Sequence, residues 1–299
     1  MSEEIDRRDF LRRSAGAAAA LSGMAAAEGA AADSAPARLK KAVIYGMLPD
    51  TLPMADRFKL ARDVGFEGVE IAPVGQAEAE AMRAAAQAAG IPIHSVIYGG
   101  WGAPMSSADD ATIAKGHAEI EAALRCAHWA GADGILLVPA VVNANTRYVD
   151  AYRRSQANIR KMEPLAAELQ VDINIEEVWN NFLLSPIEFA QYVDGFKSPR
   201  VHAYFDVGNV VRFGWPQDWI RTLGKRIHKV HLKDFKGGPG LGTGGQWVNL
   251  GEGSIDWPEV KKALQEVGYT GYVTTELGGG DEAYLRDLVA RIDRLLTGA

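Results

Sequence analysis

From residue 40 onward, short apolar runs rich in β-branched residues alternate with longer segments in which apolar positions recur every three or four residues. Runs of the first kind are typical of buried strands, and segments of the second kind are typical of amphipathic helices. The pattern predicts eight strands, at 41–47, 68–73, 91–98, 134–139, 171–178, 202–207, 228–234 and 271–277. A helix is expected after each strand, at 55–64, 77–89, 111–130, 148–169, 185–196, 217–224, 257–267 and 282–296.

Glycines support this division of the chain, because a left-handed residue commonly closes the last turn of a helix. The glycines that follow a helical segment and precede a strand are Gly65, Gly90, Gly131 and Gly268. Eight strand–helix units in one α/β domain over residues 36–299 favour a single (β/α)8 TIM barrel. An open doubly wound sheet is the alternative, but the turn after the first strand, Tyr45-Gly46-Met47, lacks its glycine-rich phosphate loop.

The first 35 residues have a different character from the rest of the chain. Paired arginines, Arg7 and Arg8, precede Phe10 and an alanine-rich run at 15–27. This arrangement resembles a twin-arginine export signal. The run is shorter than the roughly 20 apolar residues that a permanent membrane span requires. We therefore expect 1–35 to be a signal peptide and linker recognised by the twin-arginine translocation machinery, which makes the mature protein periplasmic or extracytoplasmic, without a permanent membrane span.

The overall composition narrows the class of protein. The chain has 299 residues, of which 47% are hydrophobic and 23% are charged, so it is long and apolar enough to bury a sizeable core. Its formal net charge of -6 has the wrong sign for binding a phosphate backbone, which argues against a nucleic-acid partner. The one cysteine, Cys126, excludes an internal disulfide and a zinc–thiolate cluster.

Four consecutive predicted strands end in acidic residues or carry a histidine near the end. In a barrel the carboxyl ends of the strands meet around one mouth, where catalytic groups lie. Each residue alone has a simpler interpretation, as a helix cap, a turn residue or a buried histidine with hydrogen bonds. Together they indicate a cation, because three carboxylates in one place repel one another without it. The four candidate ligands are Glu176, Asp206, His231 and Glu276.

Three carboxylate oxygens and one imidazole suit one divalent ion, Mn²⁺ or Mg²⁺, with Co²⁺ or Zn²⁺ also open. Of the neighbours Glu176 and Glu177, only one can face the barrel axis, and the outward packing of Ile173 and Ile175 assigns that place to Glu176. A carboxylate removes a proton next to a carbonyl only if the resulting enediolate is stabilised, which the ion would do. Glu176 and Glu276 are therefore the candidate catalytic acid and base.

Other side chains are candidate substrate contacts at the same mouth, although each also has a structural interpretation. Lys233 shares a strand face with His231 and could hold a substrate hydroxyl, whereas an exposed lysine paired with Asp234 is the alternative. The glycine-rich stretch 237–245 is interpreted as a mobile lid or a plain surface loop. The remaining candidates, which could equally pack in the core, support the site or be exposed, are His94, Glu70, Glu252, Trp101 and Trp179.

The ordered motifs resemble the xylose isomerase-like TIM-barrel family of sugar isomerases and epimerases. The motifs that carry the resemblance lie at 175–181, 205–209, 230–234, 250–257 and 275–276. Similarity to the D-tagatose 3-epimerase-like members implies that the four residues Glu176, Asp206, His231 and Glu276 bind one divalent cation. It also implies that the two glutamates exchange a proton from opposite faces of the substrate. Those epimerases have a histidine and an arginine where this chain has Asn209 and Gly237.

The sequence therefore predicts a divalent-metal-dependent sugar isomerase or epimerase that acts on a free sugar or keto-sugar through an enediolate. One alternative is a lyase or hydrolase that breaks oxidised glycosides by β-elimination. Another is a non-catalytic, sugar-binding barrel. A DNA-repair endonuclease on the same barrel is disfavoured by the negative charge and by only six histidines. A homo-oligomer is compatible with the sequence.

Overall fold

The computed structural model describes residues 38–237 and 244–298. The predicted signal peptide at 1–35 lies outside the described residues, as does the 238–243 part of the glycine-rich stretch. Within the described part, no helix combines the length and apolar character needed to cross a membrane.

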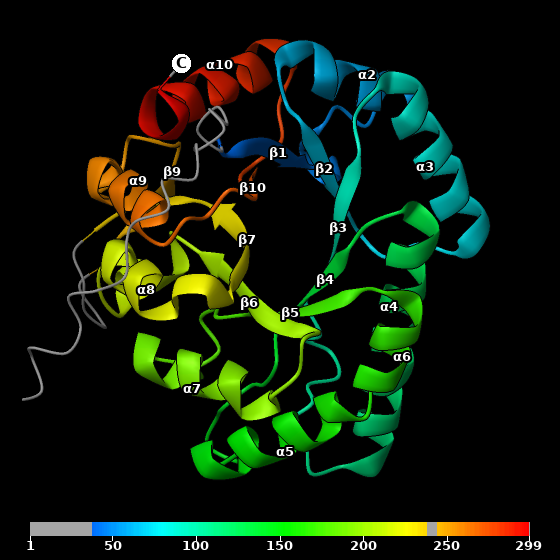
Figure 1. The fold of residues 1–299 in the computed structure, drawn as a ribbon, viewed down its shortest axis with the longest axis vertical. Helices are drawn as coiled ribbons and strands as arrows, with labels where there is room; N and C mark the ends of the chain where they lie inside the picture. The colour runs from blue at the N-terminus through cyan, green and yellow to red at the C-terminus, as the bar shows by residue number, and fades with distance from the viewer. Residues whose placement is uncertain (1–37, 238–243, 299) are drawn as a thin grey trace, which may run out of the picture. The chain divides into compact units, whose positions relative to one another are not determined.

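Eight parallel strands form a closed barrel (Figure 1). Around the barrel the order is β1, β10, β7, β6, β5, β4, β3, β2, and then β1 again. The fold is the single α/β TIM barrel that the alternation of segments predicts. The bounds of the barrel strands are β1 Lys40–Ile44, β2 Gly68–Ile71, β3 Ile93–Tyr98, β4 Gly134–Leu137, β5 Asp172–Glu176, β6 Val201–Asp206, β7 Ile227–Leu232 and β10 Tyr272–Thr275.

Helices surround the strands as an outer ring (Figure 1). Their bounds are α2 Met54–Val64, α3 Gln76–Ala89, α4 Asp110–Ala130, α5 Tyr148–Arg160, α6 Glu163–Leu169, α7 Pro186–Phe196, α8 Pro216–Leu223, α9 Trp257–Glu266 and α10 Glu282–Ile292. Short segments η1 Tyr45–Met47, η2 Asn209–Arg212, η3 Gly224–Arg226 and η4 Asp293–Thr297 complete the described elements. The main core lies between the strands and this ring, where for example Ile173 and Ile175 of β5 are fully buried.

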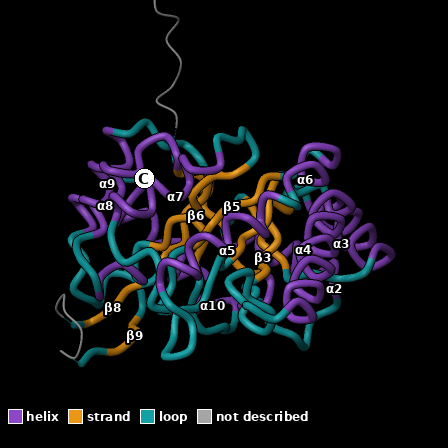
Figure 2. Tube along the Cα trace, turned by 90° about the horizontal axis from the view of Figure 1, so that it is seen from below, coloured by secondary structure: helices purple, strands orange, loops and turns teal. Residues whose placement is uncertain are grey.

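The predicted strand at 41–47 ends at Ile44, and Tyr45–Met47 forms the short helix η1. Two other predicted elements differ more strongly from the structure. The expected helix at 148–169 is divided into α5 and α6, and Pro164 lies in the first turn of α6, where its missing N–H costs nothing. The seventh strand ends at Leu232 instead of residue 234. Asp234 begins a separate strand, β8 (Asp234–Lys236), which pairs antiparallel with β9 (Gln246–Val248) in a hairpin outside the barrel (Figure 2).

Helix ends follow the local chemistry of the chain. Gly90, which ends α3, has a φ of 74°, and its N–H donates to the Gln87 carbonyl at 3.0 Å. Asp109 begins α4 by accepting a hydrogen bond from the Thr112 N–H at 2.8 Å. Such caps satisfy backbone groups that have no partner inside the helix. The helices therefore begin and end where short sequence motifs predict.

Candidate metal centre

Four side chains converge at the carboxyl ends of neighbouring barrel strands. Glu176 ends β5, Asp206 ends β6, His231 lies on β7, and Glu276 directly follows β10. One potential ligand atom from each side chain lies within 4.8 Å of the other three. From His231 Nδ1, the distances are 2.8 Å to Glu276 Oε2, 3.4 Å to Glu176 Oε1 and 3.9 Å to Asp206 Oδ2. The structure thus brings together the four residues that the sequence proposes as ligands.

The atoms that face this common point lack well-formed hydrogen bonds. All four are buried, and none forms a hydrogen bond among the described residues, although Lys233 Nζ lies within ion-pair distance of the second and fourth: Glu176 Oε1, Asp206 Oδ2, His231 Nδ1 and Glu276 Oε2. A buried polar atom without a partner costs free energy, and four of them aimed at one point are best explained by a ligand. Three carboxylate oxygens and one imidazole nitrogen are a suitable donor set for one divalent cation. The residues therefore fit a metal ion.

Local backbone contacts orient Asp206, the acidic ligand at the end of β6. Asp206 Oδ1 accepts hydrogen bonds from the N–H groups of Gly208 at 2.8 Å and Asn209 at 2.7 Å, which leaves Oδ2 for the centre. Glu177 points the other way, and its Oε1 accepts from the Asp206 N–H at 2.8 Å. As strand alternation predicts, Glu176 alone of the two adjacent glutamates faces the centre.

Burial and mutual charge shift the acidity of these groups in opposite directions. Burial raises the pKa of Glu176 to about 7, and it also raises the pKa of Asp206. Burial pushes the pKa of Glu276 upward as well, but the neighbouring His231 and Lys233 charges lower it to about 2. In the absence of a cation, the two glutamates therefore have very different proton affinities, which is a common feature of acid–base sites.

Lys233 belongs to the same centre. Its Nζ lies 2.8 Å from Glu276 Oε2 and 3.2 Å from Asp206 Oδ2. Burial lowers the pKa of this ammonium, but the carboxylates of Asp206 and Glu276 outweigh that effect and raise it overall. The alternative pairing with Asp234 does not occur, because Asp234 accepts hydrogen bonds from the hairpin and from Trp257 Nε1. Lys233 is therefore placed to donate to an oxygen near the centre.

Glu70 lies behind the ligand histidine, not at the mouth. Its Oε2 is 2.7 Å from His231 Nε2, and its Oε1 accepts a hydrogen bond from Tyr204 Oη at 3.0 Å. All three side chains are fully buried. The expectation that Glu70 contacts the substrate is therefore corrected, because His231 separates its carboxylate from the centre.

Two further sequence candidates lie away from the ligands. His94 is the second residue of β3, near the amino end of the barrel, where it contacts Thr274 Oγ1 at 3.1 Å and stacks on Tyr272. Glu252 is exposed and forms an ion pair with Arg291 at 2.9 Å. Their predicted substrate contacts have no support in this geometry. His94 lies at the start of β3, whereas the ligands lie at strand ends, and Glu252 lies in a loop, where no periodicity indicates the direction of a side chain.

An aromatic wall, defined as Trp179, Trp247 and Phe235, stands beside the centre. Trp179 stacks on Trp247 with ring centroids 4.9 Å apart, and Phe235 packs edge-on against both. Lys233 Nζ lies 5.6 Å from the Trp247 ring centroid, so the same lysine adjoins the wall and the ligand carboxylates. Trp247 nevertheless leaves 44% of its surface exposed. Trp101, the other tryptophan candidate, is 52% exposed in the loop after β3.

The sequence interpretation missed Tyr204 and Trp247. Tyr204 is two positions before Asp206 on β6, so period-two alternation places both side chains on the inner face and could have identified it. Trp247 follows the glycine-rich stretch and lies in a three-residue strand. No local pattern shows that this segment folds back toward the ligands.

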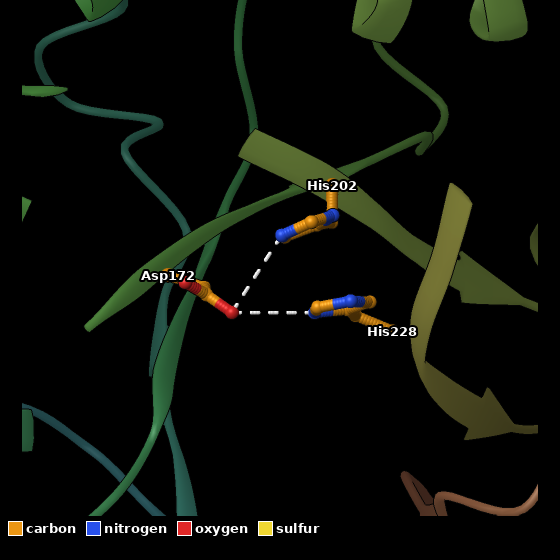
Figure 3. Close-up of side chains that lie close together, drawn as sticks. All are labelled: Asp172, His202 and His228. Carbon is orange, nitrogen blue, oxygen red and sulfur yellow. Dashed lines mark ion pairs between the residues drawn. The ribbon is translucent and has the colours of Figure 1, made fainter. Parts of the chain in front are cut away.

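A second group of potential ligands lies at the opposite, amino-terminal end of the barrel (Figure 3). Asp172 Oδ2 is 3.6 Å from His202 Nε2 and 3.3 Å from His228 Nδ1. The two imidazole rings are stacked, with centroids 3.4 Å apart and planes inclined by 14°. A nitrogen lone pair lies in the plane of its ring, so two directly stacked, nearly parallel rings do not direct their lone pairs at one ion. Arg200 also donates to Asp172 at 3.0 Å, which makes this an ion-paired cluster and not a metal site.

Comparison with known proteins agrees with the fold. Residues 58–295 match the family model described as xylose isomerase-like TIM barrel. The match covers most of the chain, and the protein belongs to this family.

Individual relatives are more distant. The chain is 25% identical over 249 residues to 2-oxo-tetronate isomerase of Haemophilus influenzae, which covers 77% of this chain and 90% of that protein. The structure resembles D-psicose 3-epimerase, solved with D-fructose, with a TM-score of 0.72, 20% identity and coverage of 87% and 100% of the two chains. It also resembles 3-keto-D-glucoside 4-epimerase of E. coli, with a TM-score of 0.73, 17% identity and coverage of 86% and 100%.

A further solved structure contains a metal. The IolI protein with a bound zinc atom aligns with a TM-score of 0.74 and 16% identity, over 87% of this chain and 100% of that one. At such identities the structural likeness shows a shared fold. Of the relatives described above, three carry enzyme names, one isomerase and two epimerases, which agrees with the prediction that this protein is an isomerase.

Proposed function

We propose that the protein is a divalent-metal-dependent sugar isomerase or epimerase that moves a proton next to a carbonyl of a free sugar or keto-sugar. The observation that carries this proposal is the convergence, within 4.8 Å of one another, of four buried ligand atoms that form no hydrogen bond among the described residues. Glu176, Asp206, His231 and Glu276 would hold the ion. A bound divalent cation supplies Lewis acidity, which stabilises negative charge on a substrate oxygen.

The order of the strands gives the two glutamates complementary positions. Glu176 comes from β5 and Glu276 from β10, and β6 and β7, which carry the other two ligands, lie between them. The glutamates therefore flank the centre from two sides, as proton removal on one face and return on the other would require. One acts as the base that takes the proton, and the other supplies or returns it. Lys233 donates a hydrogen bond to a substrate oxygen, because its ammonium lies between the ligand carboxylates and the aromatic wall.

The donor set supports Mn²⁺ or Mg²⁺ as the ion, since three of four ligands are carboxylates. Zn²⁺ and Co²⁺ remain alternatives, and zinc occupies the solved structure of the IolI protein. Measurement of the metal content of protein purified without added metal tests this choice. Stripping with a chelator should abolish activity, and titration with Mn²⁺, Mg²⁺, Co²⁺ and Zn²⁺ in turn should identify the ion that restores it.

Solvent exchange tests the reaction itself. The metal-loaded protein is incubated in deuterated water with a panel of free sugars, keto-sugars and glycosides, and the products are analysed by NMR. Deuterium incorporation at a carbon next to a carbonyl, with all substituents retained, supports the proposal. Loss of water or of an aglycone would instead identify a β-eliminating lyase or hydrolase.

Substitution of the two glutamates supplies the control for that experiment. Glu176→Gln and Glu276→Gln should each abolish exchange, whereas Glu168→Gln, an exposed change on α6, should leave it unaltered. Near-native exchange in either site variant contradicts its role in proton transfer. If Glu276→Gln loses the metal but neither the native nor the variant protein exchanges a proton of any sugar in the panel, the result favours the non-catalytic, sugar-binding barrel.

The last part of the proposal is export through the twin-arginine route. This part rests on Arg7, Arg8 and the apolar run that follows them. This route carries folded proteins, which suits a chain that takes up its ion before export. Fractionation of cells that express the full chain should place the processed protein outside the cytoplasm. Replacement of both arginines by lysine should retain the unprocessed chain inside the cell, and unchanged export would contradict this part of the proposal.

A further inference from the structure

Three fully buried residues form a chain of hydrogen bonds that ends on the candidate metal ligand His231. Tyr204 Oη donates to Glu70 Oε1 at 3.0 Å, and Glu70 Oε2 lies 2.7 Å from His231 Nε2. Tyr204 also packs against the imidazole, with ring centroids 4.4 Å apart. Both carboxylate oxygens of Glu70 are therefore occupied, and the imidazole is held at its edge and on its face.

Glu70 and His231 come from distant parts of the barrel. Glu70 lies on β2, and β1 and β10 separate β2 from β7, which carries His231. The carboxylate thus reaches across the barrel interior to the histidine. Burying a carboxylate costs free energy unless charge and hydrogen bonds compensate it, so the contact between Glu70 and His231 has to supply a compensating gain.

We propose that Glu70 and Tyr204 are positioning residues that prepare His231 to bind the ion. A carboxylate acceptor at Nε2 favours the tautomer with a proton on Nε2, which leaves the Nδ1 lone pair facing the other three ligand atoms. Glu70 also makes the ring a stronger electron donor through Nδ1. Tyr204 keeps the Glu70 carboxylate in this orientation by occupying its second oxygen.

The geometry excludes a direct role of either residue in substrate binding. Glu70 and Tyr204 have no exposed surface, and His231 lies between Glu70 and the other three ligand residues. The inference rests on the proposed function only in assuming that the centre holds a divalent ion. Its tests therefore measure ion binding in the absence of any sugar.

The main experiment compares Mn²⁺ dissociation constants of the full-length protein, measured by competition with a chelating dye. Glu70→Gln preserves the size of the side chain but removes its charge, and it should weaken binding about 10- to 100-fold, the usual effect of losing such a partner. Tyr204→Phe removes only the hydroxyl and should weaken binding by a smaller factor, about threefold to tenfold. A dissociation constant of Glu70→Gln within about twofold of the native value would overturn the inference.

Matched controls separate positioning from general stability. Glu67→Gln makes the same chemical change three residues earlier, where the carboxylate pairs with Arg38. Tyr269→Phe removes a phenol that donates to the Tyr272 carbonyl at 2.6 Å, near the amino end of the barrel. Both controls should retain native Mn²⁺ affinity. A merely structural role of Glu70 predicts the reverse pattern, a lower melting temperature of the metal-free Glu70→Gln protein with unchanged affinity.

NMR of the Zn²⁺-loaded protein provides a second measurement. In the native protein, the Nε2 proton of His231 should be shifted downfield and protected from solvent, as expected for a hydrogen bond to a carboxylate. The shift should decrease in Glu70→Gln, while a proton on Nδ1 in the native protein would contradict the assignment. If the native protein binds neither Mn²⁺ nor Zn²⁺, the metal centre itself is refuted. If the native protein binds them and Glu70→Gln binds them equally well, only the positioning role of Glu70 is refuted.

Discussion

Lys233 Nζ lies 2.8 Å from Glu276 Oε2, so a fixed positive charge touches one of the two proposed acid–base glutamates. The contact has two opposite consequences. The ammonium can stabilise negative charge that develops on a substrate oxygen, but it also repels a cation bound by the same carboxylates.

Lys233→Met should therefore separate catalysis from metal binding. We expect kcat/KM to fall about 100-fold, because one preorganised donor is lost. Mn²⁺ should bind about tenfold more tightly, because a neighbouring positive charge is removed. Steady-state kinetics and Mn²⁺ titration measure the two effects. Lys236→Met, on the exposed end of β8, is the control, and weaker Mn²⁺ binding in Lys233→Met would contradict the electrostatic argument.

Trp247→Ala should weaken substrate binding with little effect on chemistry. The exposed face of this ring adjoins Lys233, so a sugar at the centre can stack on it, and an aromatic contact contributes on the order of 1 kcal/mol. We expect KM to rise about five- to tenfold while kcat stays within about twofold. Kinetics with Trp129→Ala, on helix α4, serve as the comparison. An unchanged KM in Trp247→Ala would show that the aromatic wall does not contact the substrate.

Asp234 should be essential for the hairpin and the loop after it. This buried carboxylate accepts from the N–H groups of Gly251 and Gly253 and from Trp257 Nε1, at 2.8, 3.2 and 2.9 Å. Asp234→Ala leaves these donors without a partner, and we expect a loss of about 2–4 kcal/mol in the free energy of unfolding. Urea denaturation measures the loss. Asp234→Asn, which keeps one acceptor oxygen, should lose less, and equal losses in the two variants would contradict this account.

The pair of Lys41 and Asp293 should make stability depend on pH. Lys41 Nζ donates to both carboxylate oxygens, at 2.7 and 2.9 Å. Burial raises the pKa of Asp293, but Lys41 and Thr297 outweigh this effect and lower it. A carboxyl group whose pKa is lower in the folded than in the unfolded state stabilises the fold at pH values above the unfolded-state pKa, near 3.9. This stabilisation disappears as the pH falls through the folded-state pKa.

Asp293→Asn should therefore be less stable than the native protein by about 1 kcal/mol at pH 7, a modest value for a partly exposed pair. The difference should shrink as the pH is lowered from 5 toward the folded-state pKa. Thermal unfolding of both proteins across this range provides the measurement. A difference that is constant with pH would mean that the charge of Asp293 does not contribute to stability.

Much of the fold is encoded locally. Apolar runs and helical periodicity predicted eight strand–helix units, because strands with two buried faces and amphipathic helices leave different patterns in a sequence. The same reasoning failed at residues 148–169, where an apolar pattern continues through a break between two helices. It also missed the β8–β9 hairpin, because three-residue strands are too short to show alternation.

The candidate site was predictable to the extent that it depends on strand ends. Glu176, Asp206 and His231 were selected because barrel topology brings the ends of neighbouring strands together, and the structure places their ligand atoms at one point. Glu252 was misplaced, and the choice between substrate contact and a supporting role for Glu70 stayed open, since neither loop direction nor the reach of a side chain across the barrel leaves a local pattern.

The sequence by itself determined the strand–helix alternation, the helix caps and the inward direction of Glu176, since each depends on residues near one another in the chain. Only the tertiary structure decided that Glu70 holds His231 and that Trp247 adjoins Lys233. Those contacts join segments distant along the chain, and their geometry depends on how the closed barrel and the hairpin pack as a whole.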